Sequence, residues 1–271
     1  MEPNLHINDP AVKTDKEKEA GNELVLSYLT LRNLIGFGGM LLPIVLAVLP
    51  SRSSEYRGFE PSISDYYFTD RGDILVVMLC IIGAFLITYY GYSFKEWLLT
   101  FIAGICGMGV AFVPTKMGCD ACDFTVHTKF GGVFKTLAGT GWHFAFAATF
   151  LFSLAIMSLV YFTKGAPGEP AIKAVGKPTQ KARRNRIFKI CGWTIIASLV
   201  ILGIYFILKN FIELDLRPFP IVYAFETLAV EAFGFSWLVK GQTLWPDGEH
   251  YLVTGFKLFK KAMSAKSDPQ I

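Results

Sequence analysis

Residues 187–208 read IFKICGWTIIASLVILGIYFIL, and Lys189 is the only charged side chain in this run. A helix that crosses a membrane needs about 20 mostly apolar residues, because the hydrocarbon core of a bilayer is about 30 Å thick. The composition of the whole chain fits such a solvent. Of its 271 residues, 52% are hydrophobic and 18% are charged, whereas a soluble domain has about 25% charged residues. The sequence therefore predicts an integral membrane protein.

Five further stretches have the same apolar character. Together, the six predicted spans cover about residues 29–49, 74–94, 97–113, 142–162, 187–208 and 221–239. The third span is the shortest, and Pro114 marks its end because proline does not continue a helix. We expect an all-α fold in which residues 24–241 form an integral membrane bundle of six transmembrane helices. A polar cytoplasmic tail over residues 1–23 precedes it, and a cytoplasmic tail over residues 242–271 follows it.

Lysine and arginine are concentrated in one set of connections, and this predicts the orientation of the helices. The set comprises the N-terminal tail, the turn at Lys95, the connection after the fourth span and the C-terminal tail. It holds most of the 26 Lys and Arg residues. Cytoplasmic loops carry such an excess, so we expect both termini in the cytoplasm and the loops 51–73, 114–141 and 209–220 outside. The polar start of the chain has no apolar segment of the signal-peptide kind. We expect a multi-pass protein of a bacterial plasma membrane, the inner membrane.

The connection after the fourth span is the most basic part of the chain. Residues 164–181 are rich in Gly, Pro, Ala and Lys, which predicts a mobile cytoplasmic loop. Arg183, Arg184 and Arg186 follow just before the fifth span. We expect this region to set the topology and to attract anionic lipid headgroups. Nucleic acid is not an expected partner.

The C-terminal tail has the pattern of a surface helix. Leu252, Phe256, Phe259 and Met263 are spaced four, three and four residues apart, so they share one helical face. Because lysines project from the other side, the pattern predicts an amphipathic helix on the inner membrane surface.

One acidic residue is predicted close to the middle of the membrane. Glu231 lies ten residues into the sixth span, which at about 1.5 Å per residue corresponds to a depth of roughly 15 Å. A charge at this depth is costly, so Glu231 is either protonated or paired within the bundle. Arg32 is the best cationic candidate, because its long side chain can reach several ångströms. The pair would tie two helices together, or Glu231 would titrate in a proton-coupled function.

A second group of polar residues is predicted at the outer ends of three spans. Ser64 and Asp65 precede the second span, His143 opens the fourth, and Glu226 lies about a turn and a half inside the sixth. Histidine transfers protons near neutral pH, and a neighbouring carboxylate can orient it. We take these four residues as a candidate pocket. The alternative is structural: Asp65 and Asp73 would cap helices, and His143 would bond a loop carbonyl.

Glycine residues in two of the predicted spans indicate close helix packing. Gly36, Gly38 and Gly39 in the first span, and Gly104, Gly107 and Gly109 in the third, would allow close helix approach.

Cys119 and Cys122 form a C-x-x-C in an outer loop, where an oxidising exterior favours a disulfide. Free thiols and a metal site remain alternatives. Since structural zinc sites need four ligands, no metal is expected, and no cofactor motif is present.

The run Ile63-Ser64-Asp65, a histidine at the start of the fourth span, and the sequence from Phe233 to Gly241 occur together on a six-span chain. In these features the chain resembles the bacterial six-span membrane families of unknown function over about residues 25–241. More distantly it is similar to the superfamily of the DRAM autophagy modulators and the lipid-remodelling proteins of GPI-anchor maturation. The resemblance implies a six-helix bundle with a lipid-related role. Only Ser64, Asp65 and His143 match the distant pattern.

Three functions follow from these patterns. The first is binding or handling of a membrane lipid at an outward-facing pocket lined by Ser64, Asp65, His143 and Glu226. The second is a lipid hydrolase or transferase with His143 as general base, Asp65 or Glu226 as its orienting group, and Ser64 or a bound water as nucleophile. The third is a small proton-coupled transporter that uses Glu231. A structural subunit and a homo-oligomer are open alternatives, and lipid handling is the function we expect.

Overall fold

The structure is a computed structural model that describes residues 23–49, 60–115, 136–137, 139, 141–164, 180–212 and 220–241. These residues contain helices and connections and no strands. The chain divides into two compact units. The first combines the N-terminal part up to Leu34 with the residues from Gly241 onward, and the second runs from Ile35 to Lys240. The second unit holds nearly all the helices of the described ranges and is the one described below.

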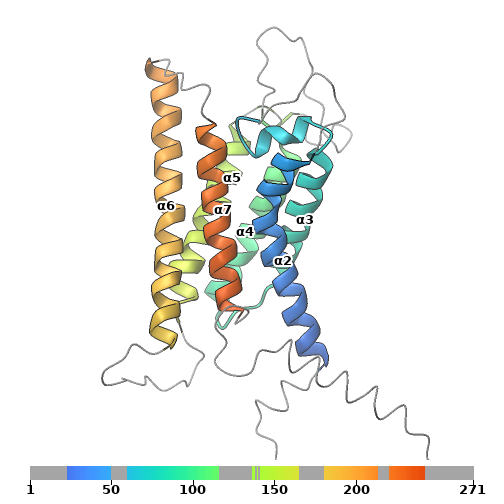
Figure 1. Cartoon of the computed structure of the whole chain (residues 1–271), viewed down its shortest axis with the longest axis vertical. Helices are drawn as coiled ribbons and strands as arrows, with labels where there is room; N and C mark the ends of the chain where they lie inside the picture. Colours follow the sequence, from blue (N-terminus) through green and yellow to red (C-terminus); the bar gives the residue numbers. More distant parts are fainter. Residues whose placement is uncertain are drawn as a thin grey trace, which may run out of the picture. The chain divides into compact units, whose positions relative to one another are not determined.

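Six α-helices and two short helical segments make up the described residues. They are α2 (Glu23–Val48), the 3-10 helix η1 (Ser64–Phe68), α3 (Gly72–Thr88), α4 (Phe94–Phe112), α5 (Trp142–Ile156), the π-helical turn η2 (Met157–Tyr161), α6 (Gln180–Ile212) and α7 (Ile221–Lys240). Figure 1 shows them along the chain. The prediction of an all-α protein is confirmed for this part of the chain.

Five of the described helical segments are long and apolar enough to cross a membrane, so the chain has the character of a membrane protein. They are Thr30–Val48, Phe94–Phe112, Trp142–Tyr161, Lys181–Ile212 and Ile221–Lys240. The helix α3 is apolar but has only 17 residues, about 26 Å of helix against a hydrocarbon core of about 30 Å. The sequence predicted the third span as the shortest. In the structure the shortest is the second, α3, when α5 is counted together with the helical turn η2 that continues it.

A cap sets the start of α4, the helix that follows α3. Ser93 Oγ accepts a hydrogen bond from the Glu96 N–H at 3.3 Å, and Glu96 Oε2 accepts one from the Tyr92 N–H at 3.0 Å. This is close to the capping box, in which a serine and a glutamate three residues later satisfy free N–H groups at a helix start. The cap starts α4 at Phe94, three residues earlier than predicted, and residues 89–93 are turn rather than span.

The helix α6 is longer than its apolar run. Its 33 residues extend about 50 Å, well beyond the thickness of a bilayer core. It begins at Gln180, so Lys181, Arg183, Arg184 and Arg186 are helical. The sequence predicted Lys181 as the last residue of a mobile loop, whereas the helix begins before it. That assignment was wrong because lysine and arginine are good helix formers, and a search for apolar spans does not detect a helix that continues into water.

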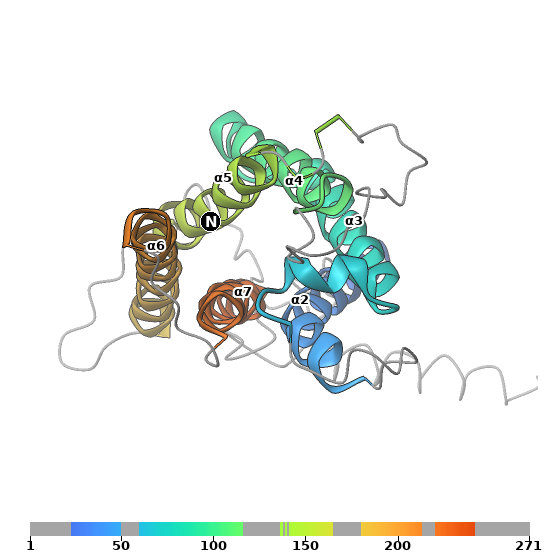
Figure 2. The ribbon, with the colours of Figure 1, turned by 90° about the horizontal axis from the view of Figure 1, so that it is seen from above.

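Consecutive helices of the second unit pack side by side. Contacts join α3 to α4, α4 to α5, α5 to α6 and α6 to α7, and α7 also contacts α5. The part of α2 from Ile35 onward completes the arrangement: Gly36 approaches Trp237 and Leu238 of α7, and Gly38 approaches Met78 of α3. Figure 2 shows α6 on the outer side of this group, next to α5. Helices α2, α3, α4, α5 and α7 therefore surround a common interior.

Glycine permits the closest of these approaches. A Cβ atom on Gly104 would lie 2.5 Å from the carbonyl oxygen of Gly83 and 2.7 Å from Ile87 Cγ1. Both distances are shorter than carbon atoms tolerate, so α3 and α4 can meet here only because the side chains are absent. Small residues at membrane-helix interfaces have this role.

At each end of the second unit, a cationic side chain donates hydrogen bonds to backbone carbonyls. At the end where α7 begins, which we call the Ser64 end, Arg71 donates from Nη1 to the carbonyl oxygens of Leu46 and Leu49 at 2.5 and 3.1 Å. At the opposite Lys240 end, Lys240 donates to the carbonyl oxygens of Phe162 and Lys164, both at 3.3 Å. The last carbonyls of a helix have no hydrogen-bond partner within the helix. Each cation donates hydrogen bonds to such carbonyls, and its positive charge interacts favourably with the negative end of the helix dipole.

Candidate functional site

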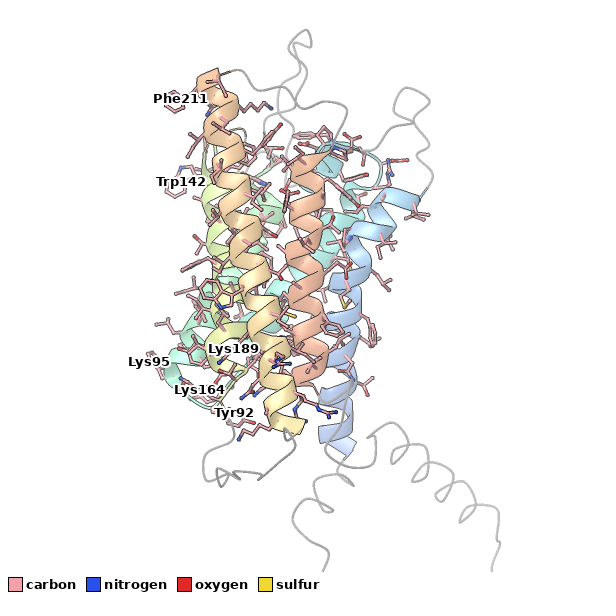
Figure 3. The ribbon with its side chains drawn as sticks, turned by 60° about the vertical axis from the view of Figure 1, so that its left-hand side comes forward. Tyr92, Lys95, Trp142, Lys164, Lys189 and Phe211 are labelled. Atoms are coloured by element: carbon pink, nitrogen blue, oxygen red, sulfur yellow. The ribbon has the colours of Figure 1, made fainter. Side chains whose placement is uncertain are left out.

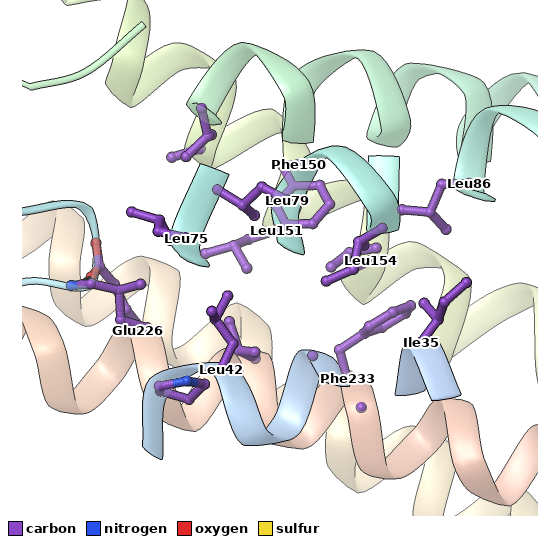
Figure 4. Close-up of a pocket in the computed structure, with 18 of the residues that line it drawn as sticks. Ile35, Leu42, Leu75, Leu79, Leu86, Phe150, Leu151, Leu154, Glu226 and Phe233 are labelled. Carbon is purple, nitrogen blue, oxygen red and sulfur yellow. Dashed lines mark hydrogen bonds between the residues drawn. The ribbon is translucent and has the colours of Figure 1, made fainter. Parts of the chain in front are cut away.

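A cavity of about 100 Å³ lies between the helices that surround the interior. Figure 4 shows it with most of its lining side chains. The lining is almost wholly apolar, with side chains such as Leu42, Leu79, Phe150, Leu154 and Phe233. Two lining residues differ: Ser64 and Glu226 carry hydroxyl and carboxyl groups at one end. The site therefore joins a hydrocarbon interior to a small polar end.

The segment before α3 brings Ser64 to the cavity. Glu226 Oε2 of α7 accepts a hydrogen bond from the Ile63 N–H at 2.7 Å, and the Pro61 carbonyl accepts one from the Tyr223 N–H at 2.9 Å. The Tyr223 hydroxyl donates to the carbonyl of Pro43 in α2 at 2.6 Å. Segment 60–68, the start of α7 and the end of α2 are thus held together by hydrogen bonds next to Ser64.

Ser64 and His143 form a hydrogen-bonded pair at this end. The Ser64 Oγ lies 3.0 Å from His143 Nε2, and His143 Nδ1 lies 2.6 Å from the carbonyl oxygen of Val113. A carbonyl oxygen can only accept, so Nδ1 carries the proton and the Nε2 of a neutral ring must accept from the Ser64 hydroxyl. Both side chains are buried, with exposed fractions of 8% for Ser64 and 3% for His143. The geometry is that of a hydroxyl whose proton is directed at a base.

His143 bonds a backbone carbonyl, as the structural alternative predicted, and not the carboxylate that the hydrolase hypothesis predicted. A carboxylate, Asp65 or Glu226, was the expected partner of the ring. Instead Asp65 Oδ1 accepts from the Thr115 hydroxyl at 3.3 Å, and Glu226 bonds to the Ile63 N–H. The carbonyl of Val113, at the end of α4, holds the ring. Backbone carbonyls often fix the tautomer of histidine in this way.

Asp65 acts on the site through its charge and through its own turn. The Asp65 N–H donates to Ser62 Oγ at 3.1 Å, which links the first turn of η1 to the residue before its N-cap Ile63. Burial raises the pKa of the Asp65 carboxyl, while hydrogen bonds from Ser62 and Thr115 and the proximity of His143 oppose that rise. Asp73 lies in the first turn of α3, and Arg71 is the residue at its N-cap position.

A group that the sequence did not single out lies beside this turn. Glu60 is 6% exposed. Burial and the charge of Asp65 raise the pKa of the Glu60 carboxyl, and Arg71 lowers it. The Arg71 guanidinium lies 4.8 Å above the ring of Tyr66, whose hydroxyl accepts from the Glu60 N–H at 3.4 Å. The sequence contained only one signal for this group, the concentration of charged residues before the second span.

Glu231 lies in α7 and is separate from this site. Its carboxyl is partly buried, and Oε1 has no hydrogen-bond partner among the residues that the structure describes. Arg32 belongs to the first compact unit and Glu231 to the second, so the predicted pair between them stays a prediction.

Several predicted features fall outside the described residues. These are Cys119 and Cys122, the N-terminal tail as far as Gly21 and Asn22, most of the loop 164–181 and the amphipathic tail 242–271. Cys80, Cys106 and Cys191 are free thiols. Within the described ranges, no group of three or more His, Cys, Asp or Glu side chains is arranged to hold a metal ion.

The chain was compared with family models, curated proteins and solved structures, and none of them matches it.

Proposed function

We propose that this protein binds a membrane lipid, with part of one hydrocarbon chain in the interhelical cavity and the polar part of the lipid at the Ser64 end. The observation that carries the proposal is the cavity itself, whose lining is apolar except for Ser64 and Glu226. An apolar cavity of this kind stays dry and takes up apolar groups. Its small volume suits part of a single chain rather than a whole lipid.

The dimensions of the cavity support a chain that lies along the helices. Glu226 and Trp237 both line it, and their separation of eleven positions along α7 corresponds to about 16 Å. The hydroxyl and carboxyl groups of the lining, those of Ser64 and Glu226, occur at the Glu226 end. A lipid has the same division, with a polar group at one end of a long apolar chain, so the cavity and the ligand correspond in both length and polarity.

The distribution of surface residues supports a position in the membrane with the Ser64 end outside. Figure 3 shows Lys95, Lys164 and Lys189 toward the Lys240 end, and Trp142 and Phe211 toward the Ser64 end. The Trp142 and Phe211 side chains are 55% and 83% exposed. Lysine and arginine favour the cytoplasmic side. We therefore propose a multi-pass plasma membrane protein whose basic end attracts anionic lipid headgroups and whose binding site faces the outer leaflet.

Native mass spectrometry of the protein, purified in a mild detergent, tests the proposal. A lipid that the wild-type protein retains and that a cavity-filling variant loses would support it. A wild-type protein without bound lipid would contradict it.

A further inference from the structure

The hydrogen-bonded pair at the polar end of the cavity has a geometry that lipid binding alone does not require. Ser64 lines the cavity, and His143 Nε2 lies behind its hydroxyl at 3.0 Å. Ser64 therefore borders the space proposed for the lipid, whereas His143 bonds to Ser64 without lining that space itself. An activated serine needs this order of groups.

We infer that Ser64 and His143 are the nucleophile and general base of an acyl-transfer site that cleaves the carboxylic ester of a membrane lipid. The inference rests on the proposed lipid binding, because the cavity would hold the acyl chain that leads to the ester carbon. The polar end of the cavity and the ester both lie where the chain meets the polar part of the lipid.

The first half-reaction follows from the tautomer. The Ser64 Oγ attacks the ester carbonyl carbon while His143 Nε2 takes the hydroxyl proton. The bond between the acyl carbon and the ester oxygen then breaks. The leaving alcohol takes the proton from Nε2, and the acyl group remains on Oγ.

The second half-reaction restores the site with water as the acceptor. His143 Nε2 takes a proton from a water molecule, whose oxygen bonds to the acyl carbon. The Ser64–acyl bond breaks, and Oγ recovers the proton from Nε2. The products are a fatty acid and a lipid alcohol, and no oxidation or reduction occurs.

Two neighbours position the pair. The Val113 carbonyl accepts from His143 Nδ1 at 2.6 Å, which keeps Nε2 free to accept and stabilises the ring when it becomes charged. Glu226 Oε2 accepts a hydrogen bond at 2.7 Å from the N–H of Ile63, the residue before the nucleophile. Glu226 is therefore a positioning residue, whereas Ser64 and His143 are the catalytic ones.

The test combines a covalent probe with a lipid substrate. The wild-type protein is treated with an alkyl fluorophosphonate, which modifies activated serines, and the modified residue is identified by peptide mass spectrometry. Hydrolysis of a phospholipid with a radiolabelled acyl chain is measured in mixed micelles. The variants are Ser64→Ala and His143→Asn, and the Asn side chain keeps a donor for Val113 while removing the base. The control is Ser158→Ala, because Ser158 is buried against Ser236 at 2.8 Å and does not line the cavity.

The inference expects fluorophosphonate on Ser64 and a loss of hydrolysis of about 100-fold or more in both variants, the size of a general-base contribution, with Ser158→Ala unchanged. A wild-type protein that retains lipid but is neither labelled at Ser64 nor active would overturn the inference and leave the proposed lipid binding in place. Labelling at Ser64 with no retained lipid would contradict lipid binding alone. The labelling site needs no substitution, so the test holds even if Ser64→Ala does not fold.

Discussion

Glu226 and Ile63 are 163 residues apart in the chain, yet the Glu226 carboxyl oxygen Oε2 lies 2.7 Å from the backbone nitrogen of Ile63. This bond connects α7 to the segment that carries Ser64. It accounts for the position of a polar residue at the end of an apolar cavity, and it can be tested by substitution.

Replacing Glu226 should show what this bond contributes. We expect Glu226→Ala to lower the free energy of unfolding by about 1–3 kcal/mol, because the buried Ile63 N–H loses its acceptor. Glu226→Gln keeps a carbonyl oxygen at the same place and should retain most of the stability. Thermal unfolding in detergent measures both. Equal losses in the two variants would mean that the acceptor oxygen is not what stabilises this contact.

The contact between α3 and α4 should depend on the absence of a side chain at Gly104. A Cβ there would meet the Gly83 carbonyl oxygen at 2.5 Å, so Gly104→Ala should destabilise the protein by about 1–3 kcal/mol through overpacking. The matched control is Gly203→Ala in α6, where a Cβ would meet nothing within 4 Å. That control should be neutral or slightly stabilising, because alanine favours helix over glycine. A stable Gly104→Ala protein would contradict the observed closeness of the helices.

Stability should fall as the pH rises above the ordinary range of a carboxyl group. Asp65 and Glu60 have raised pKa values because both are buried. Below the pKa of the unfolded chain, near 3.8 for Asp65, both states hold the proton. As the pH rises toward the raised folded pKa, the unfolded state releases its proton first and is favoured. Unfolding measured between about pH 4 and about pH 7 should show this decline, and Asp65→Asn should reduce it. An unchanged slope in that variant would remove Asp65 as the cause.

The helices were largely predictable because a helix that is surrounded by lipid needs a continuous run of apolar residues, which the sequence shows directly. Apolar runs located α7, and α5 together with the helical turn η2 that continues it, within one residue of their observed ends. The start of α6 at Gln180 was missed because its first turns are basic and lie outside any apolar run. The start of α4 at Phe94 had a readable signal, the serine and glutamate of its cap.

The candidate site was predictable in its side chains but not in its backbone. Ser64 and His143 were noticed as polar residues at helix ends, and the structure brings them together at 3.0 Å. The Val113 carbonyl, which orients the histidine, has no sequence signature because every residue has such a group. The Ile63 N–H, which donates a hydrogen bond to Glu226, also has no sequence signature. Both bonds depend on how the helices pack, which one sequence does not reveal.

Lipid binding in the cavity is the central claim, and native mass spectrometry of three matched proteins tests it most directly. Gly39 lines the cavity, and a Cβ there meets Ile82 at an ordinary 3.7 Å, so Gly39→Leu should fill the space without a backbone clash. Gly203→Leu adds the same side chain to α6, which contributes no residue to the cavity lining. We predict a discrete lipid on the wild type and on Gly203→Leu, and its loss from Gly39→Leu. Equal lipid on all three proteins, or none on the wild type, would contradict the account.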